Sequence, residues 1–497
     1  VKLADKAFLL KSTCSEKKEY LDGEQIISIA KKNKIEAIHP GYGFLSENSN
    51  FAKLVEDTGI KFIGPPYKAI EIMGDKIISK KHAKNIDVST IPGLQDEIKS
   101  YEDAIKAADK IGFPLIIKAS AGGGGKGMRI VYEKKELKDK FKSAKNEAET
   151  SFGDSRVFIE KFIEEPRHIE IQIVGDQFGN YLHLGERDCS IQRRNQKIIE
   201  ESPSPFIDTK IRDLMAGQAI ALAKSVNYFS AGTVEFIVDK NKDFYFLEMN
   251  TRLQVEHPVT EMVTGIDLVE MMIRIASKEK LNLKQSEISF NGSAIEARVY
   301  AEDPARDFMP SAGRLIKYKS PEQFSSKSEI IRNDTGVFEG STISLHYDPM
   351  ISKLCAWSEK RNKTIELLIN AINKFSIDGI KNNLNFLSAI LINKNFNKGT
   401  FSTKFLEMEY PNGFKSYQLN KNELCKLSAA VLAIYKNYEI LTQTDEKNII
   451  KTELSDFNFF VDTGLDQFSL SWNIRNGNHE ISGKDNINFN IKIFKFL

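Results

Sequence analysis

The chain has 497 residues, which is too long for a single hydrophobic core and predicts three or four domains. Hydrophobic residues make up 41% and charged residues 28%, the composition of an ordinary globular protein. The net charge of +2 gives no reason to expect a nucleic acid or an anionic membrane as a partner. No apolar run approaches the roughly 18 residues that a membrane span requires, so we expect no membrane-embedded segment.

Cysteine usage and the two ends of the chain bear on location. The four cysteines show no CxxC spacing, which favours a reducing compartment over a disulfide scaffold. We therefore expect a cytoplasmic protein, with a mitochondrial precursor as the alternative because a lost targeting segment would not be visible. The chain begins at Val1 without Met and ends inside a period-2 strand pattern at 487–493, so we expect a fragment truncated at both ends.

Residues 1–74 predict the remains of an open parallel sheet. A helical pattern at 24–32 precedes a short apolar strand at 35–38, and a second strand pattern lies at 61–63. The loop at 39–43 follows the first strand at its carboxyl end, where ligands bind in such sheets. Two strands make a small sheet, so we expect more strands before the first residue.

A run of four glycines lies between two strand patterns, at 115–118 and 129–132. Glycines such as Gly124 and Gly125 have no side chain to keep the backbone away from an anion. The run is not a Walker A loop, because its Lys126 is not followed by Ser or Thr. A strand, a glycine flap and a second strand indicate a mobile lid over a triphosphate; a flexible hairpin turn is the alternative.

A hairpin pattern at 234–250 carries two carboxylates. If residues 241–242 form a two-residue turn, Glu235 lies directly opposite Glu248, with Cβ atoms about 4.5–5.5 Å apart. Asn250 follows two residues later on the same face. These oxygens suit Mg²⁺ that bridges phosphates. The alternative is the solvated face of an ordinary hairpin, but like charges placed opposite each other favour a cation.

Polar residues of the same parity continue this pattern at Arg252, Gln254 and Glu256. An arginine binds an oxyanion bidentately, and a glutamate beside it can act as general base. The alternative is a polar edge strand. The basic segment 187–197 resembles a nucleic-acid patch, but acidic residues dilute it and no aromatic side chain interleaves for base stacking. It fits charge compensation around a triphosphate better, whereas His168 alone would more often be structural.

The fold class predicted from these patterns is a multidomain α/β and α+β protein. A further α+β segment contains a helix near 363–375, and the composition then shifts towards Asn, Lys and Phe. A helix near 427–435 precedes alternating strands, including 457–461 and 468–474. The expected domains are 1–74, 75–275, 276–407 and 408–497.

These motifs together resemble the biotin carboxylase family, a branch of the ATP-grasp ligases. The matching runs lie, in the order of the family, at 39–48, 73–76, 118–128, 160–163, 186–194, 248–258 and 378–383. The resemblance covers roughly residues 1 to 407. It implies a partial N-terminal biotin carboxylase domain, an ATP-grasp domain and a C-terminal biotin carboxylase domain, followed by the start of a helix-plus-β-barrel-like domain that contacts a partner subunit.

The resemblance also implies roles for individual residues. The ATP site would comprise Lys76, Lys118, Gly124, Gly125, Glu160, Lys161, Phe162, Ile163, His168, Gln192, Asn195, Glu235 and Glu248. Metal would be held by Glu235, Glu248 and Asn250, and bicarbonate by Lys197, Arg252, Gln254 and Val255. Glu256 would deprotonate bicarbonate, Arg332 would stabilise the biotin enolate, and Phe308 would line the biotin pocket.

The implied reaction uses ATP with Mg²⁺ (or Mn²⁺) to form carboxyphosphate from bicarbonate, and then carboxylates biotin on a carrier domain. No biotin attachment motif is present in the sequence, so the carrier domain is expected elsewhere. Asn195 and the extension after residue 407 resemble the alpha chains of propionyl-CoA carboxylase, which implies a carboxyltransferase beta subunit as partner in a hetero-oligomer. The alternatives are another biotin-dependent carboxylase (acetyl-CoA, methylcrotonyl-CoA or pyruvate), a different ATP-grasp ligase, and an inactive scaffold.

Overall fold

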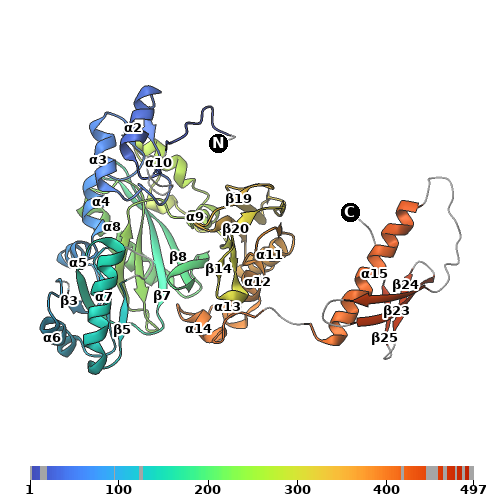
Figure 1. The fold of residues 1–497 in the computed structure, drawn as a ribbon. Coiled ribbons are helices and arrows are strands. Elements are labelled where there is room, and N and C mark those ends of the chain that lie inside the picture. Colours follow the sequence, from blue (N-terminus) through green and yellow to red (C-terminus); the bar gives the residue numbers. More distant parts are fainter. Residues whose placement is uncertain are drawn as a thin grey trace. The chain divides into compact units, whose positions relative to one another are not determined.

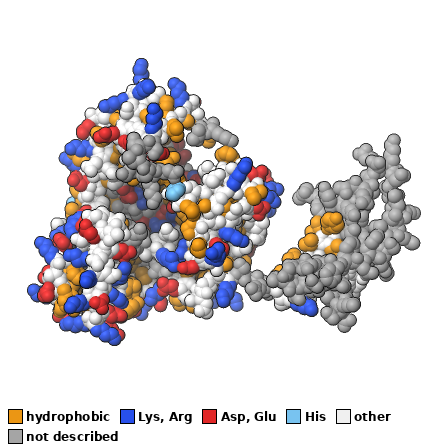
Figure 2. Space-filling view, in the orientation of Figure 1, with side chains coloured by type: hydrophobic (Ala, Val, Ile, Leu, Met, Phe, Trp, Pro, Cys, Tyr) orange, Lys and Arg blue, Asp and Glu red, His pale blue; other side chains and the backbone are white. Residues whose placement is uncertain are grey.

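The computed structural model describes residues 3–11, 19–94, 96–121, 127–415, 419–443, 457–462, 467–475, 478–483 and 487–491. The chain forms two units, Val1–Phe414 and Lys415–Leu497 (Figure 1). Figure 2 shows acidic and basic side chains interspersed over the visible face of the first unit, in keeping with the small net charge. Among the residues described, no helix combines the length and apolar character that crossing a membrane would need.

The N-terminal segment contains the parallel pair of strands that the sequence predicts. Strand β1 (Ala37–Ile38) pairs in parallel with β2 (Lys61–Phe62). The flanking helices are α2 (Gly23–Lys32), α3 (Ser49–Asp57), α4 (Tyr67–Gly74) and α5 (Lys76–Asn85). Asn48 caps α3 by accepting a hydrogen bond from the Phe51 amide, and buried Phe51, Val55 and Phe62 form a small core beneath it.

A small antiparallel sheet follows, in the order β3-β6-β4-β5. Its strands are β3 (Gly93–Leu94), β6 (Val157–Lys161), β4 (Leu115–Ala119) and β5 (Arg129–Val131). The helices α6 (Tyr101–Ile111) and α7 (Leu137–Phe152) bury their alanine-rich faces against it. Strands β4 and β5 therefore flank the glycine run as predicted, although residues 122–126 themselves, including Gly124 and Gly125, lie outside the described residues.

The centre of the first unit is a nine-stranded sheet. Its order is β11 (Phe244–Asn250), β10 (Ser230–Val238), β7 (Arg167–Gly175), β8 (Tyr181–Arg193), β9 (Gln196–Ser202), β12 (Ser293–Tyr300), β20 (Met350–Ser358), β18 (Glu329–Thr335) and β17 (Phe324–Ser325). All its pairings are antiparallel. Because β9 pairs with β12, the sheet crosses the boundary expected at residue 275.

Helices cover this sheet and supply its apolar cores. They are α8 (Thr209–Ser225), α9 (His257–Thr264), α10 (Leu268–Ala276), α11 (Arg361–Asn373), α12 (Leu384–Ile392), α13 (Lys394–Lys398) and α14 (Phe405–Glu409). Three short pairs accompany them: β13 (Glu302–Asp303) with β14 (Met309–Pro310), β15 (Gly313–Arg314) with β19 (Thr342–Ile343), and β16 (Lys317–Lys319) with β21 (Ser376–Asp378). One core lies over α8, β7 and β10, and another lies between α11, α12 and β20.

The second unit consists of one long helix and a four-stranded antiparallel sheet. Helix α15 (Lys421–Gln443) packs against strands of the sheet β22 (Phe457–Asp462), β23 (Gln467–Arg475), β24 (Asn478–Gly483) and β25 (Ile487–Ile491). Its opposite face exposes Leu427, Val431, Ile434 and Tyr435, an apolar stripe at helical spacing that is visible in Figure 2. The helix and strands predicted after residue 407 are confirmed where the structure describes them.

Candidate active site

The hairpin of β10 and β11 places Glu235 opposite Glu248, as the sequence predicts, but for a different reason. The turn is not the two residues 241–242: Val238 pairs with Phe244, and the Asp239 amide donates to the Asp243 carbonyl across a longer loop. The register then shifts between Glu235 and Phe236, where the strands carry a bulge. The one-residue difference in the turn and the bulge compensate each other.

This bulge also decides which side chains enter the core. Phe246 pairs with Phe236 and is fully buried, whereas Glu248 lies on the opposite face beside Glu235. Phe246 and Glu248, which are two residues apart in sequence, therefore lie on opposite faces of the hairpin. The strand also ends at Asn250, so the expected continuation through Glu256 is instead a loop that leads into α9.

Glu235 is the centre of a buried hydrogen-bond network. Its carboxylate accepts from His168 Nε2 at 2.7 Å, Asn250 Nδ2 at 2.7 Å, Gln254 Nε2 at 2.8 Å and Lys197 Nζ at 3.0 Å. Burial would raise the pKa of Glu235, but Lys197 and His168 hold that pKa well below its usual range. His168 is thus part of the site and not an isolated structural histidine.

Lys197 joins three buried carboxylates. Its ammonium group lies 2.5 Å from Glu170 Oε2, 2.6 Å from Glu256 Oε1 and 3.0 Å from Glu235 Oε1. Burial alone would lower the pKa of Lys197. The Cys189 thiol and the three carboxylates nevertheless raise that pKa well above its ordinary value. Glu256 also accepts from Arg298 Nη2 at 2.9 Å. Although burial disfavours its ionised form, Lys197 and Arg298 lower the pKa of Glu256, so its carboxylate is ionised.

Arg187 supports this network from beneath and was not recognised from the sequence, where it was grouped with residues around a triphosphate. Its fully buried guanidinium donates to Glu170, Gln254, Gln172, Thr260 and Thr233 at 2.5–3.1 Å. Those bonds fix the Gln254 amide and the Glu170 carboxylate.

Arg252 reaches the site together with a residue from the N-terminal segment. Its Nε donates to Glu47 Oε2 at 2.7 Å, and its Nη2 donates to Asn250 Oδ1 at 3.2 Å. The Thr251 amide donates to the other Glu47 oxygen at 3.1 Å. Glu47 therefore ties the loop after β1 to the strand that carries the acidic pair.

The predicted ATP residues fall into two pairs and a surface turn. Lys76 Nζ lies 3.0 Å from Glu248 Oε2, and Lys118 Nζ donates to Glu160 Oε2 at 3.0 Å. On the segment that ends β6, Lys161 donates to the Phe113 carbonyl at 2.9 Å, Phe162 contacts Tyr132, and Ile163 follows the strand. Gln192 and Asn195 lie at the β8–β9 turn, where Asn195 has φ of 63°.

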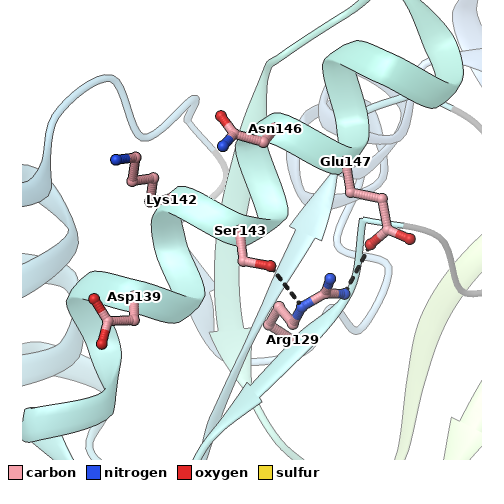
Figure 3. A pocket seen from close by; sticks show the side chains of 6 residues that line it. All are labelled: Arg129, Asp139, Lys142, Ser143, Asn146 and Glu147. Atoms are coloured by element: carbon pink, nitrogen blue, oxygen red, sulfur yellow. Dashed lines mark hydrogen bonds and ion pairs between the residues drawn. The ribbon is translucent and has the colours of Figure 1, made fainter.

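The glycine flap is fixed at its C-terminal end, where Gly127 donates its amide to Glu147 Oε2 at 3.0 Å. Arg129 donates to the same oxygen at 2.7 Å and to Ser143 Oγ at 3.2 Å. Figure 3 shows these three side chains beside a pocket between β5 and α7, with Arg129 directed at the helix. The chain just after the glycine run is therefore held against α7.

The two predicted biotin residues are placed differently. Arg332 lies on β18 and donates to Glu261 Oε2 at 2.6 Å and to both Asp334 oxygens at 2.8 Å. The ring of Phe308 is buried between Phe386, at 4.8 Å, and the Arg193 guanidinium, at 4.2 Å. Arg332 is thus partly exposed and surrounded by polar partners, whereas the ring of Phe308 packs mainly as a core side chain. The place of Phe308 in a biotin pocket stays a prediction.

Lys353 connects Arg332 to Val255, one of the residues predicted to bind bicarbonate, and was also not predicted from the sequence. Its ammonium donates to the Val255 carbonyl at 2.8 Å and lies 3.4 Å from Asp334, the partner of Arg332. No local pattern marks it, because β20 is distant in sequence. For Glu170 the sequence does carry a pattern, because the polar residues His168, Glu170 and Gln172 alternate along β7. In the structure Glu170 pairs in register with Glu235.

The acidic pair has the donor chemistry that Mg²⁺ requires. Glu235 and Glu248 offer hard carboxylate oxygens from directly paired residues, and Asn250 adds an amide oxygen. A second cluster, His168, Glu170 and Glu235, brings one candidate ligand atom from each side chain within 4.8 Å of one another. Histidine suits softer divalent ions, so the first set fits Mg²⁺ better.

Three family models match the chain. They describe a biotin carboxylase N-terminal domain at residues 1–70, the ATP-binding domain of the carbamoyl-phosphate synthase L chain at 75–284, and a biotin carboxylase C-terminal domain at 296–408. A Campylobacter jejuni biotin carboxylase, solved as a β-γ-ATP complex, is 45% identical with a TM-score of 0.76, and the match covers 79% of this chain and 86% of that one. The chain belongs to the biotin carboxylase family.

Further relatives belong to several biotin-dependent carboxylases. The biotin carboxylase domain of the Hydrogenobacter thermophilus 2-oxoglutarate carboxylase, solved with MgADP, ADP and bicarbonate, is 45% identical with a TM-score of 0.77 and covers 80% of this chain and 87% of its own. The propionyl-CoA carboxylase alpha chain of Ruegeria pomeroyi is 52% identical over 436 residues, and the human mitochondrial one is 48% identical over 466. These alignments cover 85% and 93% of this chain but only 64% and 63% of those relatives, so the chain spans less than two thirds of their length.

Proposed function

We propose that this chain carboxylates biotin on a carrier domain, using ATP and bicarbonate, as the first half-reaction of an acyl-CoA carboxylase. One observation carries the proposal: Lys197 joins Glu235, a member of the acidic pair, to Glu256, while Arg252 adjoins Asn250. The residues that we assign to metal binding, anion binding and proton abstraction are thus linked by direct contacts. That combination suits phosphoryl transfer to a small oxyacid.

Each group has a defined task in this reaction. Arg252, Lys197, Gln254 and the Val255 backbone would bind bicarbonate, and ionised Glu256 would accept the proton of its hydroxyl group. Lys76 and Lys118 would bind ATP phosphates. Glu235, Glu248 and Asn250 would hold Mg²⁺, or Mn²⁺ as an alternative, which neutralises charge on the transferring phosphoryl group. The glycine flap would exclude water from the labile carboxyphosphate.

Arg332 would act in the second step by stabilising the enolate of biotin, with Phe308 in the biotin pocket. We infer propionyl-CoA as the acyl-CoA of the complete enzyme, because curated relatives with about 50% identity carry that name. A carboxyltransferase beta subunit and a biotinyl carrier domain would be its partners in a hetero-oligomer. Location would be cytoplasmic or, as for the human relative named mitochondrial, mitochondrial.

The test is ADP release by the full-length protein, with bicarbonate and free biotin each omitted in turn. We expect slow, bicarbonate-dependent ADP release without biotin, and faster release with ¹⁴C-carboxybiotin formation when both are present. Glu256→Gln should abolish both, while Glu279→Gln, on an exposed ion pair, is the matched control. ADP release that is indifferent to bicarbonate would refute the proposal, and indifference to biotin would favour a different ATP-grasp ligase.

A further inference from the structure

A buried lysine that the reaction above does not use lies beside the ATP residues. Lys80 is on α5, one helical turn after Lys76, and its side chain is 2% exposed. Its ammonium donates to Glu160 Oε1 and lies 5.2 Å above the ring of Phe158. The other oxygen of Glu160 accepts from Lys118 at 3.0 Å. One buried carboxylate therefore serves two lysines.

Such a lysine is unfavourable unless its charge has a purpose. Burying an ammonium group carries a desolvation penalty that one ion pair often fails to offset, and an apolar side chain of similar length would fill the space without it. Burial lowers the pKa of Lys80 to about 8, although Glu160 favours the charged form. The group of three carries a net charge of +1, one positive charge more than Glu160 needs.

The two lysines differ in how readily the ammonium group can move away from Glu160. The Lys118 side chain is 10% exposed, whereas those of Lys80 and Glu160 are 2% exposed. Lys118 lies on β4, close to the start of the glycine flap, and Lys80 lies inside against Phe158. Lys118 is therefore the lysine positioned to turn towards a ligand, and Lys80 is the one positioned to stay.

We propose that Lys80 is a positioning residue that remains on Glu160 and thereby frees Lys118 to bind the phosphates of ATP. The inference rests on the proposed function, because it takes ATP as the ligand of Lys118. Without Lys80, moving Lys118 to a phosphate would leave the Glu160 carboxylate buried and unpaired, which is strongly unfavourable. Lys80 removes that penalty by supplying the second positive charge.

The experiment measures ATP binding directly, by calorimetry in the absence of bicarbonate and biotin, on the full-length protein. Lys80→Met should raise the Kd for ATP about 10- to 100-fold, the range for one charge-assisted contact. Lys80→Arg, which keeps a positive charge beside Glu160, should instead hold the Kd within about threefold of wild type. Turnover at saturating ATP should fall less than ATP affinity in Lys80→Met.

A purely structural role makes the opposite forecast. If Lys80 only fills space, the bulkier Lys80→Arg would bind ATP no better than Lys80→Met, and that result would overturn the inference. Equal ATP binding by wild type and Lys80→Met would overturn it too, while leaving the proposed function intact. A wild-type protein that binds no ATP would instead overturn the proposed function.

A second variant covers the case in which Lys80→Met fails to fold, as judged by its thermal melt. Lys80→Arg keeps a positive charge beside Glu160, so a folded Lys80→Arg protein should bind ATP with a Kd within about threefold of wild type. ATP binding by that variant that is more than about tenfold weaker than wild type would contradict the inference independently of Lys80→Met.

Discussion

Lys197 shows how a single residue can hold both the stability and the chemistry of a site. Three buried carboxylates, those of Glu170, Glu235 and Glu256, lie within 3.0 Å of its ammonium group, and its own side chain is 12% exposed. Removing one member of a buried ionic cluster leaves the remaining charges without compensation. The residue is therefore as much a part of the core as the apolar side chains around it.

We predict that Lys197→Met lowers the free energy of unfolding by about 3–5 kcal/mol, in addition to abolishing bicarbonate-dependent ADP release. Lys134, which is more than half exposed beside Asp109, provides the matched control. Lys134→Met should change stability by less than about 0.5 kcal/mol. Urea unfolding of both variants checks this, and similar losses for the two lysines would contradict the role given to Lys197.

His257 makes the first unit sensitive to acid. Burial, and then the nearby charge of Lys353, lower the pKa of His257 to about 3, while its Nδ1 bonds to the Gln254 carbonyl at 2.7 Å. The unfolded chain has a histidine pKa of about 6.5, so below that pH the unfolded state takes up a proton that the folded state refuses. The contribution of His257 to the free energy of unfolding is thus complete above pH 6.5 and is lost as pH falls towards 3.

The corresponding prediction compares wild type with His257→Asn, whose amide can keep the bond to the Gln254 carbonyl. Between pH 6.5 and pH 5 the histidine alone should cost wild type about 2 kcal/mol, at 1.36 kcal/mol per pH unit. The variant should lose less stability than wild type over that interval by this amount. Urea midpoints at pH 7.5, 6.5 and 5 measure it, and parallel losses in the two proteins would exclude His257 as the cause.

At the scale of elements, the β10–β11 hairpin delivers the acidic pair. The bulge next to Glu235 allows Phe246 and Met249 to enter the core while Glu248 and Asn250 face the site. Because Lys76 is the partner of Glu248 in this structure, the hairpin also connects α5 to the proposed metal ligands. The function of the hairpin depends on its register as well as on its composition.

We predict that Glu248→Gln lowers bicarbonate-dependent ADP release by about 10²–10³-fold, since positioning and electrostatics dominate phosphoryl transfer. The apparent affinity for Mg²⁺ should fall as well, and a chelator should abolish the remaining activity. Glu270→Gln, on the exposed face of α10, serves as the control. Rates of ADP release over a series of Mg²⁺ concentrations test the assignment, and wild-type turnover at saturating Mg²⁺ would exclude Glu248 as a ligand.

Local patterns in the sequence predicted these elements well. The parallel pair in the N-terminal segment, the strands around the glycine run and the hairpin all follow from short-range periodicity. The opposition of Glu235 and Glu248 was nevertheless predicted through an incorrect turn, because a bulge has no distinctive sequence signal. Its outcome was correct only since two one-residue differences cancelled.

Residues supplied by distant strands could not be found this way. Arg298 lies on β12 and Lys353 on β20, and each reaches the site through pairings between segments far apart in the chain. Arg187 and Lys80 are charged, so from their residue types they are expected at the surface or in contact with a ligand, yet both are buried. Their partners become apparent only when the sheet is assembled.

At the scale of the whole first unit, the nine-stranded sheet joins the residues that we propose for the two steps of biotin carboxylation. Arg332 lies on β18 and Glu256 lies just after β11, at opposite sides of the sheet order. Lys353 connects them, since it donates to the Val255 carbonyl and contacts Asp334, which holds Arg332. The residues proposed for bicarbonate and those proposed for biotin are thus separate groups on one continuous sheet.

This separation predicts that the two steps respond differently to mutation. Arg332→Gln should leave slow, bicarbonate-dependent ADP release largely intact and lower biotin carboxylation by about two to three orders of magnitude, the effect of one lost charge-assisted contact at a reacting centre. Arg252→Ala should depress both, because carboxyphosphate would not form. Paired assays of ADP release and ¹⁴C-carboxybiotin on each variant test this, and equal losses in both assays for Arg332→Gln would show that Arg332 also serves bicarbonate activation.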